Sequence, residues 1–339
     1  MRAAVYISEG KVELTTVPDP IPQDDDVVVK VAACGICGSD LRALTVPPEM
    51  PCQPQTIMGH EFVGTVVHAP ESSRVEMGAR VAVLPNIPCR RCAFCRSGKV
   101  NLCSNFVHLG AMRDGGAAEL CAVPPDMVFT IDDELDWATA ALAEPLACVL
   151  NGSRRANWQP GTSTLILGAG PIGLLFLVMA RLAGAAPIIV SEPHPGRREW
   201  ARRMGASIVI DPVSESLRTA VDDATGGLGV EVVVDAVGSL LDSGIAAVRP
   251  GGNVLVFGLN HRATVTVKPA DLASREIGIH GVYIANGTFP LALELLTRHP
   301  EAFNPLITHR LRLEEFWMGI ETMRSGDGVK VLLQPGGAS

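Results

Sequence analysis

The stretch of this chain that most constrains its fold is residues 164–192. It reads TLILGAGPIGLLFLVMARLAGAAPIIVSE: an apolar run as long as a buried strand, a G-x-G-x-x-G sequence, an apolar run able to form a helix, and a second strand-like run ending in an acid. In this order, the glycines allow a tight turn and close approach of the backbone to a pyrophosphate, and the following helix offers free N–H groups to the phosphates. A membrane-spanning helix is a poorer interpretation, because Arg181 and several glycines interrupt the apolar run. The stretch therefore predicts a βαβ unit that binds a dinucleotide.

The acid that ends this unit bears on the choice of cofactor. Glu192 stands 24 positions after Gly168, close to the roughly 20-residue offset at which an acid accepts hydrogen bonds from the adenosine ribose. Its carboxylate favours NAD over NADP, because it would repel a 2′-phosphate. Arg197 and Arg198 are the opposing evidence; we expect Arg197 to lie along the ribose and Arg198 to face solvent. The candidate cofactor-binding residues are Gly168, Gly170, Pro171, Ile172, Gly173, Glu192 and Arg197.

The composition limits the class of protein. A chain of 339 residues is long enough for two domains, and 47% hydrophobic residues predict a compact fold and not a disordered one. The net charge of −8 argues against a nucleic-acid partner, whose phosphates favour a basic surface. The first residues, MRAAVYISEGKVEL, lack the apolar segment of an export signal, so we expect a cytoplasmic protein without a membrane partner. In a reducing compartment, metal binding or burial explains nine cysteines better than disulfides do.

The pattern of apolar residues changes along the chain. The N-terminal part reads as short strands separated by Pro and Gly clusters, which predicts an antiparallel, partly barrel-like domain. From residue 164 onward strands and helices alternate, which predicts an α/β fold with a doubly wound parallel sheet. A late strand near 329–333 would return to the first domain and complete its sheet. The expected divisions are a catalytic domain at 1–150, a dinucleotide-binding domain at 151–284 and a returning C-terminal segment at 285–339.

Four cysteines lie within fifteen residues, in the sequence CRRCAFCRSGKVNLC. Two C-x-x-C steps let adjacent thiolates converge, and a fourth thiolate closes a tetrahedron, as in a structural zinc site. An iron–sulfur cluster is the alternative, because the spacing is not far from that of a ferredoxin. Nothing else in the chain indicates electron transfer, so we predict a structural zinc lobe at about 85–110. Its ligands would be Cys89, Cys92, Cys95 and Cys103.

A second set of metal-binding side chains is dispersed along the chain. It comprises Cys37 in GICGSD, His60 and Glu61 in GHEFVG, and Glu144 in AEPLA. One thiolate, one imidazole and one or two carboxylates make an open catalytic zinc site, with a position left for water or substrate. Asp40 would accept a hydrogen bond from the zinc-binding imidazole. The remaining cysteines are expected to be buried small hydrophobic residues, namely Cys34, Cys52, Cys121 and Cys148.

With these motifs in view, the chain resembles the zinc-dependent medium-chain alcohol dehydrogenases, and most closely their sorbitol/polyol and threonine dehydrogenase branch. The resemblance covers nearly the whole length, and glutamate in AEPL, where classical alcohol dehydrogenases have cysteine, favours the polyol-like branch. It implies a GroES-like catalytic domain, a Rossmann NAD-binding domain, a cleft between them for zinc and nicotinamide, and a homodimer or homotetramer. The motifs are GICGSD at 35–40, GHEFVG at 59–64, the cysteines at 89–103, AEPLA at 143–147, GAGPIG at 168–173 and ITHRLRL at 307–313.

The resemblance also implies the chemistry. We expect reversible NAD-linked oxidation of a secondary alcohol, of polyol, sugar alcohol or cyclitol type, to a ketone. Zinc would act as a Lewis acid, Ser39 would carry the proton away, and Glu61 would be an alternative acceptor or a transient zinc ligand. Arg42 stands where the family often has a relay histidine, and arginine does not pass a proton by deprotonating. The alternative is an NADPH-dependent zinc reductase of a ketone or activated alkene.

Overall fold

The computed structural model describes residues 1–23, 25–71 and 73–337, and these fall into two compact units. The first unit comprises Met1–Ala147 and Ala285–Ser339, and the second comprises Cys148–Ile284. The chain passes from the first unit to the second within helix α4 (Ala143–Ala156). In the described part of the chain, no helix has both the length and the apolar character that crossing a bilayer requires.

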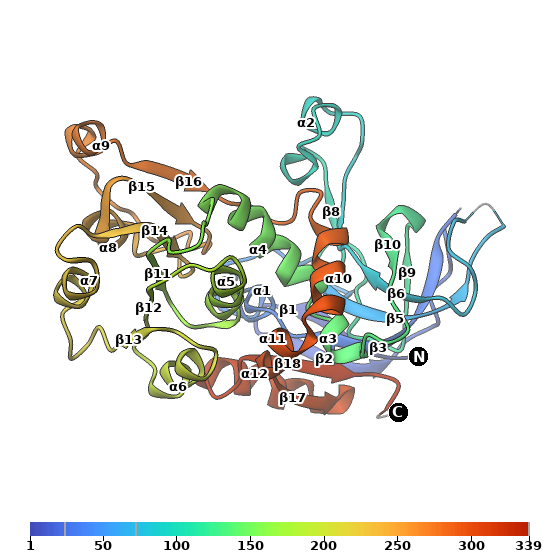
Figure 1. Cartoon of the computed structure of the whole chain (residues 1–339). Helices are drawn as coiled ribbons and strands as arrows, with labels where there is room; N and C mark the ends of the chain where they lie inside the picture. The colour runs from blue at the N-terminus through green and yellow to red at the C-terminus, as the bar shows by residue number, and fades with distance from the viewer. Residues whose placement is uncertain (24, 72, 338–339) are drawn as a thin grey trace. The chain divides into compact units, whose positions relative to one another are not determined.

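The first unit is built on a seven-stranded sheet of order β10-β6-β5-β3-β18-β17, with β9 also paired to β3, and on a three-stranded sheet of order β2-β1-β4. Figure 1 shows α2 at the tip of a projection that leaves the unit beside β8. The elements of this unit are β1 (Arg2–Ser8), β2 (Lys11–Thr16), β3 (Val27–Gly35), α1 (Gly38–Ala43), β4 (Thr56–Ile57), β5 (Glu61–His68), β6 (Arg80–Val83), β7 (Asn86–Ile87), α2 (Ala93–Arg96), β8 (Val107–His108), β9 (Leu120–Val123), β10 (Val128–Thr130), α3 (Trp137–Ala140), α10 (Phe289–Arg298), α11 (Pro300–Phe303), β17 (Ile307–Arg312), α12 (Phe316–Ser325) and β18 (Lys330–Gln334).

The C-terminal strand completes the sheet of the first unit, as the sequence predicted. β18 pairs antiparallel with β3, with Leu332 opposite Gly35 and Leu333 opposite Cys34. Its β-branched and aliphatic residues have the composition that favours a strand buried on both faces. Helix α12 packs on β18, and its side chains Phe316 and Ile320 are buried in the same core. Two segments nearly three hundred residues apart in the sequence therefore lie side by side.

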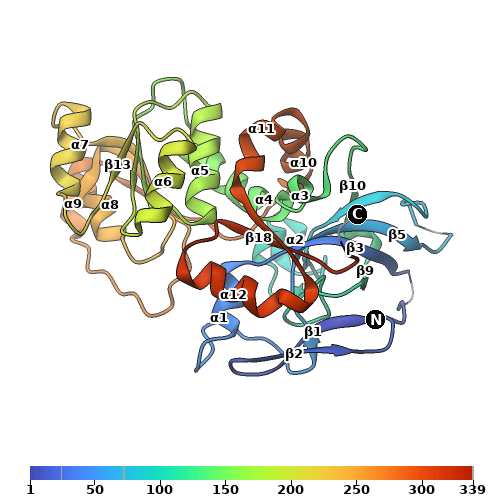
Figure 2. The ribbon, with the colours of Figure 1, turned by 90° about the horizontal axis from the view of Figure 1, so that it is seen from below.

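The second unit is a six-stranded parallel sheet of order β13-β12-β11-β14-β15-β16. Numbered from its first strand, this is the order 3-2-1-4-5-6 of a doubly wound dinucleotide-binding sheet. Figure 2 shows α5 and α6 on one side of β13 and α7 and α8 on the other. The elements are β11 (Thr164–Leu167), α5 (Pro171–Leu182), β12 (Ile188–Ser191), α6 (Pro195–Arg203), β13 (Ile208–Ile210), α7 (Leu217–Thr225), β14 (Val230–Asp235), α8 (Leu241–Ala247), β15 (Val248–Val256), α9 (Pro269–Arg275) and β16 (Gly278–Gly281).

Candidate active site

The turn after β3 positions three of the predicted side chains. Cys37 is the N-cap of α1, and its backbone N–H donates to Asp40 Oδ2 at 2.8 Å, in the manner of a capping box. This bond fixes the Asp40 carboxylate under the start of the helix. Ser39 lies between the two and is buried. The GICGSD sequence therefore folds so that a thiol, a hydroxyl and a carboxylate share one short turn.

The neighbouring strand β5 brings the second motif to this turn. Glu61 opens β5 and stands opposite Gly35 in the β3–β5 register. A Cβ atom at Gly35 would lie 2.1 Å from Glu61 Oε2, so a larger residue there would displace the Glu61 carboxylate. His60 precedes the strand and is buried, as is Glu61. The sheet, and not sequence proximity, thus joins GICGSD to GHEFVG.

Cys37, His60 and Glu61 form a compact ligand group. One ligand atom from each lies within 4.8 Å of the other two. His60 Nε2 is 3.3 Å from Ser39 Oγ. His60 Nδ1 is 3.6 Å from Asp40 Oδ1, which is longer than a hydrogen bond but close enough for a charge interaction. Glu61 Oε1 is buried and has no hydrogen-bond partner among the described residues.

The charges around His60 favour a cation. Burial disfavours a charged imidazole, but the Asp40 carboxylate and the Cys37 thiolate outweigh this and hold the pKa of His60 well above its usual value. A bound metal ion would be stabilised by the same two negative charges. Thiolate, imidazole and carboxylate are the ligands that zinc accepts, and the unpartnered Glu61 Oε1 is a ready donor. The residues present therefore fit an open zinc site.

A buried lysine, which the sequence did not reveal, completes the surroundings of Glu61. Lys330 Nζ lies 2.6 Å from Glu61 Oε2 and 3.5 Å from the carbonyl oxygen of Ile36. The side chains of Lys330 and Glu61 are only 2% and 0% exposed. Burial opposes the charge on Lys330, but Glu61 outweighs it and raises the pKa of the lysine. A lone lysine inside the apolar run of VKVLLQ, in a strand predicted to join this sheet, was the available signal.

Glu144 is close to this region but outside the ligand group. It lies in the first turn of α4 and is buried. The three ligand atoms that lie within 4.8 Å of one another belong to Cys37, His60 and Glu61. The role of Glu144 as a zinc ligand stays a prediction.

The four clustered cysteines converge as a second ligand group. The sulfur atoms of Cys89, Cys92, Cys95 and Cys103 all lie within 4.8 Å of one another. The backbone N–H of Cys89 donates to Cys103 Sγ at 3.2 Å, and that of Cys95 donates to Cys92 Sγ at 3.4 Å. Backbone N–H groups of Cys95 and Ser104 lower the pKa of the Cys92 thiol to about 6. Such thiolate-stabilising bonds and a four-sulfur donor set fit a closed zinc site.

The glycine loop of the second unit has the geometry of a phosphate-binding turn. Gly170 is the N-cap of α5, and Pro171 occupies its first turn. A Cβ atom at Gly173 would lie 1.9 Å from the carbonyl oxygen of Gly168, so helix and strand meet as closely as the motif requires. A Cβ atom at Gly170 would instead meet open space. The start of α5 therefore offers both free N–H groups and room for a pyrophosphate.

Glu192 follows β12 and is held against this loop. Its Oε2 accepts the backbone N–H of Ala169 at 2.7 Å, and its Oε1 accepts that of His194 at 2.8 Å. The expectation that Arg198 faces solvent is wrong. Its side chain is only 15% exposed, because it pairs with Asp211 at 3.0 Å and donates to the carbonyl oxygen of Glu192 at 3.0 Å. Arg198 therefore supports the backbone beneath Glu192.

Comparison with known proteins decides the family. Residues 23–133 match the alcohol dehydrogenase GroES-like domain, and residues 171–298 match the zinc-binding dehydrogenase domain. The sorbitol dehydrogenase of Bacillus subtilis (strain 168) is 33% identical over 321 residues, which cover 93% of this chain and 91% of that protein. The chain belongs to the zinc-binding, alcohol dehydrogenase-like family. The predicted GroES-like and Rossmann domains are thereby confirmed.

Two further relatives show that the similarity to this dehydrogenase family extends over nearly the whole chain. The L-threonine 3-dehydrogenase of Pyrococcus horikoshii is 35% identical over 330 residues, covering 94% of each chain. A crystal structure from Sinorhizobium meliloti 1021, described as that of a zinc-binding dehydrogenase bound to NADP, matches with a TM-score of 0.91. It is 35% identical, over 98% of this chain and 99% of that one. Both units of the chain are therefore shared with the family.

A second histidine of this dehydrogenase lies beside the ligand group. The ring of His108 packs against that of His60, with centroids 5.0 Å apart and an angle of 66° between the planes. Burial lowers the pKa of His108 to about 3, so its imidazole is neutral.

All nine cysteines are free, and Cys34, Cys121 and Cys148 are buried as expected, but Cys52 is partly exposed.

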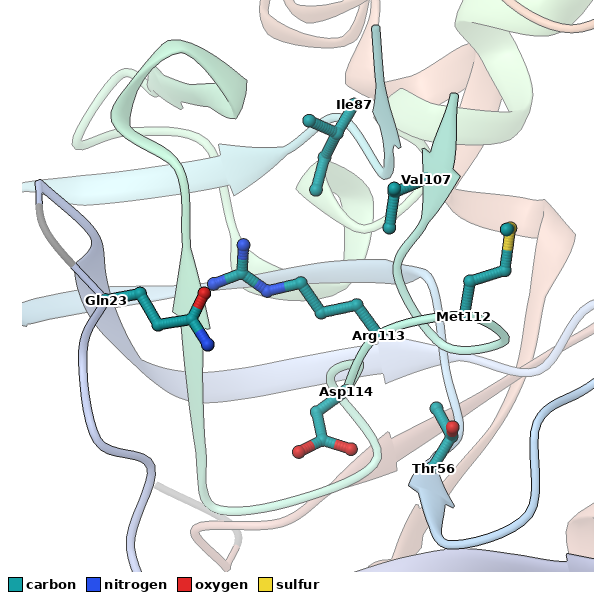
Figure 3. Close-up of a pocket in the computed structure, with 7 residues that line it drawn as sticks. All are labelled: Gln23, Thr56, Ile87, Val107, Met112, Arg113 and Asp114. Carbon is teal, nitrogen blue, oxygen red and sulfur yellow. The ribbon is translucent and has the colours of Figure 1, made fainter. Parts of the chain in front are cut away.

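A separate hollow lies in the first unit, beside the two-stranded ribbon of β7 and β8, which contributes Ile87 and Val107 to its lining. It encloses about 470 Å³, and none of the predicted site residues lines it. Arg113 Nη2 pairs with Asp26 Oδ2 at 2.5 Å, and Asp114 Oδ1 accepts the backbone N–H of Ile57, so its charged groups are engaged. Figure 3 shows the lining side chains, which are Gln23, Thr56, Ile87, Val107, Met112, Arg113 and Asp114.

Proposed function

We propose that this chain catalyses the reversible, nicotinamide-linked oxidation of a secondary alcohol of the polyol, sugar alcohol or cyclitol type to a ketone. The observation that carries the proposal is the group of Cys37, His60 and Glu61, of which His60 and Glu61 are buried, with Ser39 Oγ 3.3 Å from His60 Nε2. The name of the related sorbitol dehydrogenase supports a polyol substrate.

The residues of the chain have separate roles in this reaction. When bound, zinc supplies a Lewis acid that makes the alcohol more acidic, and the nicotinamide supplies the hydride acceptor. Ser39 Oγ receives the proton of the substrate hydroxyl and passes on its own. Asp40 holds His60 in orientation by its negative charge beside Nδ1. Arg42 takes no proton, because a guanidinium does not act by deprotonating.

The ligands of the catalytic zinc are proposed to be Cys37, His60 and a carboxylate. Glu61 is favoured by its place in the ligand group and by its unpartnered Oε1. Glu144 is the other candidate, because it is buried and its negative charge helps to raise the pKa of Lys330. Lys330 pairs with Oε2 of Glu61 and leaves Oε1 available, so Glu61 would hold zinc through Oε1, and Glu144 would be the alternative resting ligand.

The second zinc is proposed to sit among Cys89, Cys92, Cys95 and Cys103, where it would stabilise the lobe. Its four thiolates leave no position for substrate, so it has no part in the chemistry. We also propose a homodimer or homotetramer in the cytoplasm. The free state of all nine cysteines suits a reducing compartment.

The cofactor is proposed to be NAD in preference to NADP. A carboxylate at position 192, buried at the end of β12, would face the 2′-phosphate of NADP as a like charge. At ~4 Å and an effective dielectric constant near 20, one such pair costs roughly 4 kcal/mol before screening. The NADP in the related Sinorhizobium meliloti structure is the observation on the other side. It also favours the second candidate function, an NADPH-dependent zinc reductase of a ketone or activated alkene.

One screen tests these proposals. Secondary alcohols, polyols and cyclitols are offered with NAD or NADP, and ketones and enones with NADH or NADPH, while nicotinamide absorbance is followed. We expect the highest kcat/KM for a polyol with NAD, and at least ~10²-fold less with NADP. Glu192→Ala should narrow that ratio. Faster reduction of an enone with NADPH than oxidation of any alcohol would favour the reductase.

A further inference from the structure

A short two-stranded ribbon carries two polar side chains on one face. β7 and β8 pair antiparallel, with Asn86 opposite His108 and Ile87 opposite Val107. Directly opposite side chains share a face of a ribbon, and successive ones alternate between faces. Ile87 and Val107 line the hollow shown in Figure 3. Asn86 and His108 therefore share the other face.

This polar face adjoins the ligand group. The His108 ring lies edge-on to the His60 ring, with centroids 5.0 Å apart. His60 is the member of the ligand group that also contacts Ser39. A substrate hydroxyl reacting at this group would have its neighbouring substituents within reach of the ribbon.

Three polar side-chain atoms of this face are buried without a hydrogen-bond partner among the described residues. Among the described residues, Asn86 Nδ2, Asn86 Oδ1 and His108 Nδ1 have no partner, and neither residue bonds to the other. Native proteins pair nearly all such buried groups, so each exception needs an explanation. A ligand that binds beside His60 would supply the missing partners.

The chemistry of the pair defines the group that it would bind. The Asn86 amide offers two N–H donors and one acceptor oxygen, and Nδ1 of His108 adds one further polar atom. The Asn86 amide carries no charge, so it offers no counter-ion for a carboxylate, a phosphate or an ammonium group. A hydroxyl, which both donates and accepts, matches this inventory.

We propose that Asn86 and His108 bind the hydroxyl next to the reacting carbon and so select vicinal diols and polyols over alcohols with a single hydroxyl. This inference rests on the proposed function, because it needs a secondary alcohol to react at Cys37, His60 and Glu61.

The test compares 2,3-butanediol with 2-butanol, which differ by one hydroxyl. The full-length, zinc-loaded enzyme is assayed with saturating NAD, and kcat/KM is measured for each alcohol. We expect the wild type to prefer the diol by about 10-fold or more, roughly the contribution of one or two hydrogen bonds. Asn86→Leu and His108→Phe should each lower this preference about 10-fold. The phenyl ring keeps the contact with His60, so a change in preference reports the lost nitrogen atoms.

Controls separate recognition from a structural role. Ile87→Val and Val107→Ala, on the opposite face of the same ribbon, should leave the preference for the diol unchanged. Asn86→Leu should keep or raise the Tm, because it removes unsatisfied buried polar atoms. A lower Tm with an unchanged diol preference would show that the pair is structural and would overturn the inference. Equal use of both alcohols by the wild type would overturn the inference alone, whereas turnover of neither would overturn the proposed function and the inference with it.

Discussion

The two sulfur-containing ligand groups of this chain are assembled in different ways. The cysteine lobe takes all four of its ligands from one segment, residues 89–103, and three of the four are partly exposed. The group of Cys37, His60 and Glu61 is assembled by pairing β3 with β5, and Lys330 reaches it from β18. The first is closed by four thiolates and the second leaves a position open. A local site can serve stability, whereas a site assembled by the sheet can place several chemically different groups around a substrate.

The strongest test of this contrast is the loss of a ligand from the open site. Cys37→Ala should lower kcat by on the order of 10³-fold or more, because the Lewis acid contributes several kcal/mol to transition-state stabilisation. The Tm should change little, since the turn is also held by the backbone bond of residue 37 to Asp40. The measurements are steady-state kinetics, thermal unfolding and zinc content. Retention of more than a tenth of the activity would refute a metal-dependent role for Cys37.

The corresponding substitution in the cysteine lobe should lower the Tm and leave kcat largely unchanged. Cys92→Ala should lower the Tm by on the order of 10 °C, because a closed zinc site contributes its binding free energy to folding. Zinc content should drop from two ions per chain to one, while the molecules that remain folded keep most of their kcat. If Cys92→Ala abolished turnover without a change in Tm, the division between a stabilising and a reactive site would be wrong.

The ion pair of Lys330 with Glu61 tests which carboxylate lies near the metal. Lys330→Met leaves a buried carboxylate without its partner, and such a loss costs about 3–5 kcal/mol. Zinc should offset much of this cost if Glu61 is a ligand, because the dication replaces the lost positive charge. The free energy of unfolding is therefore measured with zinc bound and after chelation, with Lys330→Arg as the control that keeps the charge. Equal penalties in the two states would favour Glu144 as the resting ligand.

The smallest expected effect concerns the proton route. Ser39→Ala should lower kcat/KM for alcohol oxidation about 10²-fold, the low end of general acid–base contributions. Arg42→Ala should lower it much less, because a guanidinium passes no proton. The ratio of the two effects is read from steady-state kinetics at one pH. Equal losses in the two variants would assign Arg42 to the binding of substrate or cofactor.

Local spacing was enough to predict much of this molecule. The C-x-x-C steps and the G-x-G-x-x-G turn need only neighbouring residues to define their geometry, and the alternation of strands and helices defined the parallel sheet. The late strand near residues 329–333 was also predicted, from its apolar run, as one that returns to the first domain. Strand β15 starts at Val248, although Arg249, Pro250 and two glycines follow and by themselves read as a turn.

The parts that sequence did not reveal depend on contacts between distant segments. Lys330 is one cation in an apolar strand, and nothing in its neighbours shows that Glu61 lies 2.6 Å away. The pairing of Asn86 with His108 depends on the register of β7 and β8, which flank the cysteine lobe, and the spacing of residues in the sequence does not define that register. Arg198 was wrongly placed in solvent because its partner, Asp211, lies at the end of the next strand. Such pairings become visible only once the sheet order is known.

The late position of β18 has a consequence for how the protein is made. The ribosome delivers the whole second unit, Cys148–Ile284, before it reaches the strand that contributes Lys330. The sheet next to β3 stays open during that time, and Glu61 has no cationic partner until residue 330 has emerged. Domains generally fold as units during synthesis, so the dinucleotide-binding unit can fold while the first unit is still incomplete. The nascent chain therefore completes its reactive centre only after residue 330 has emerged, later than the unit that carries the glycine loop.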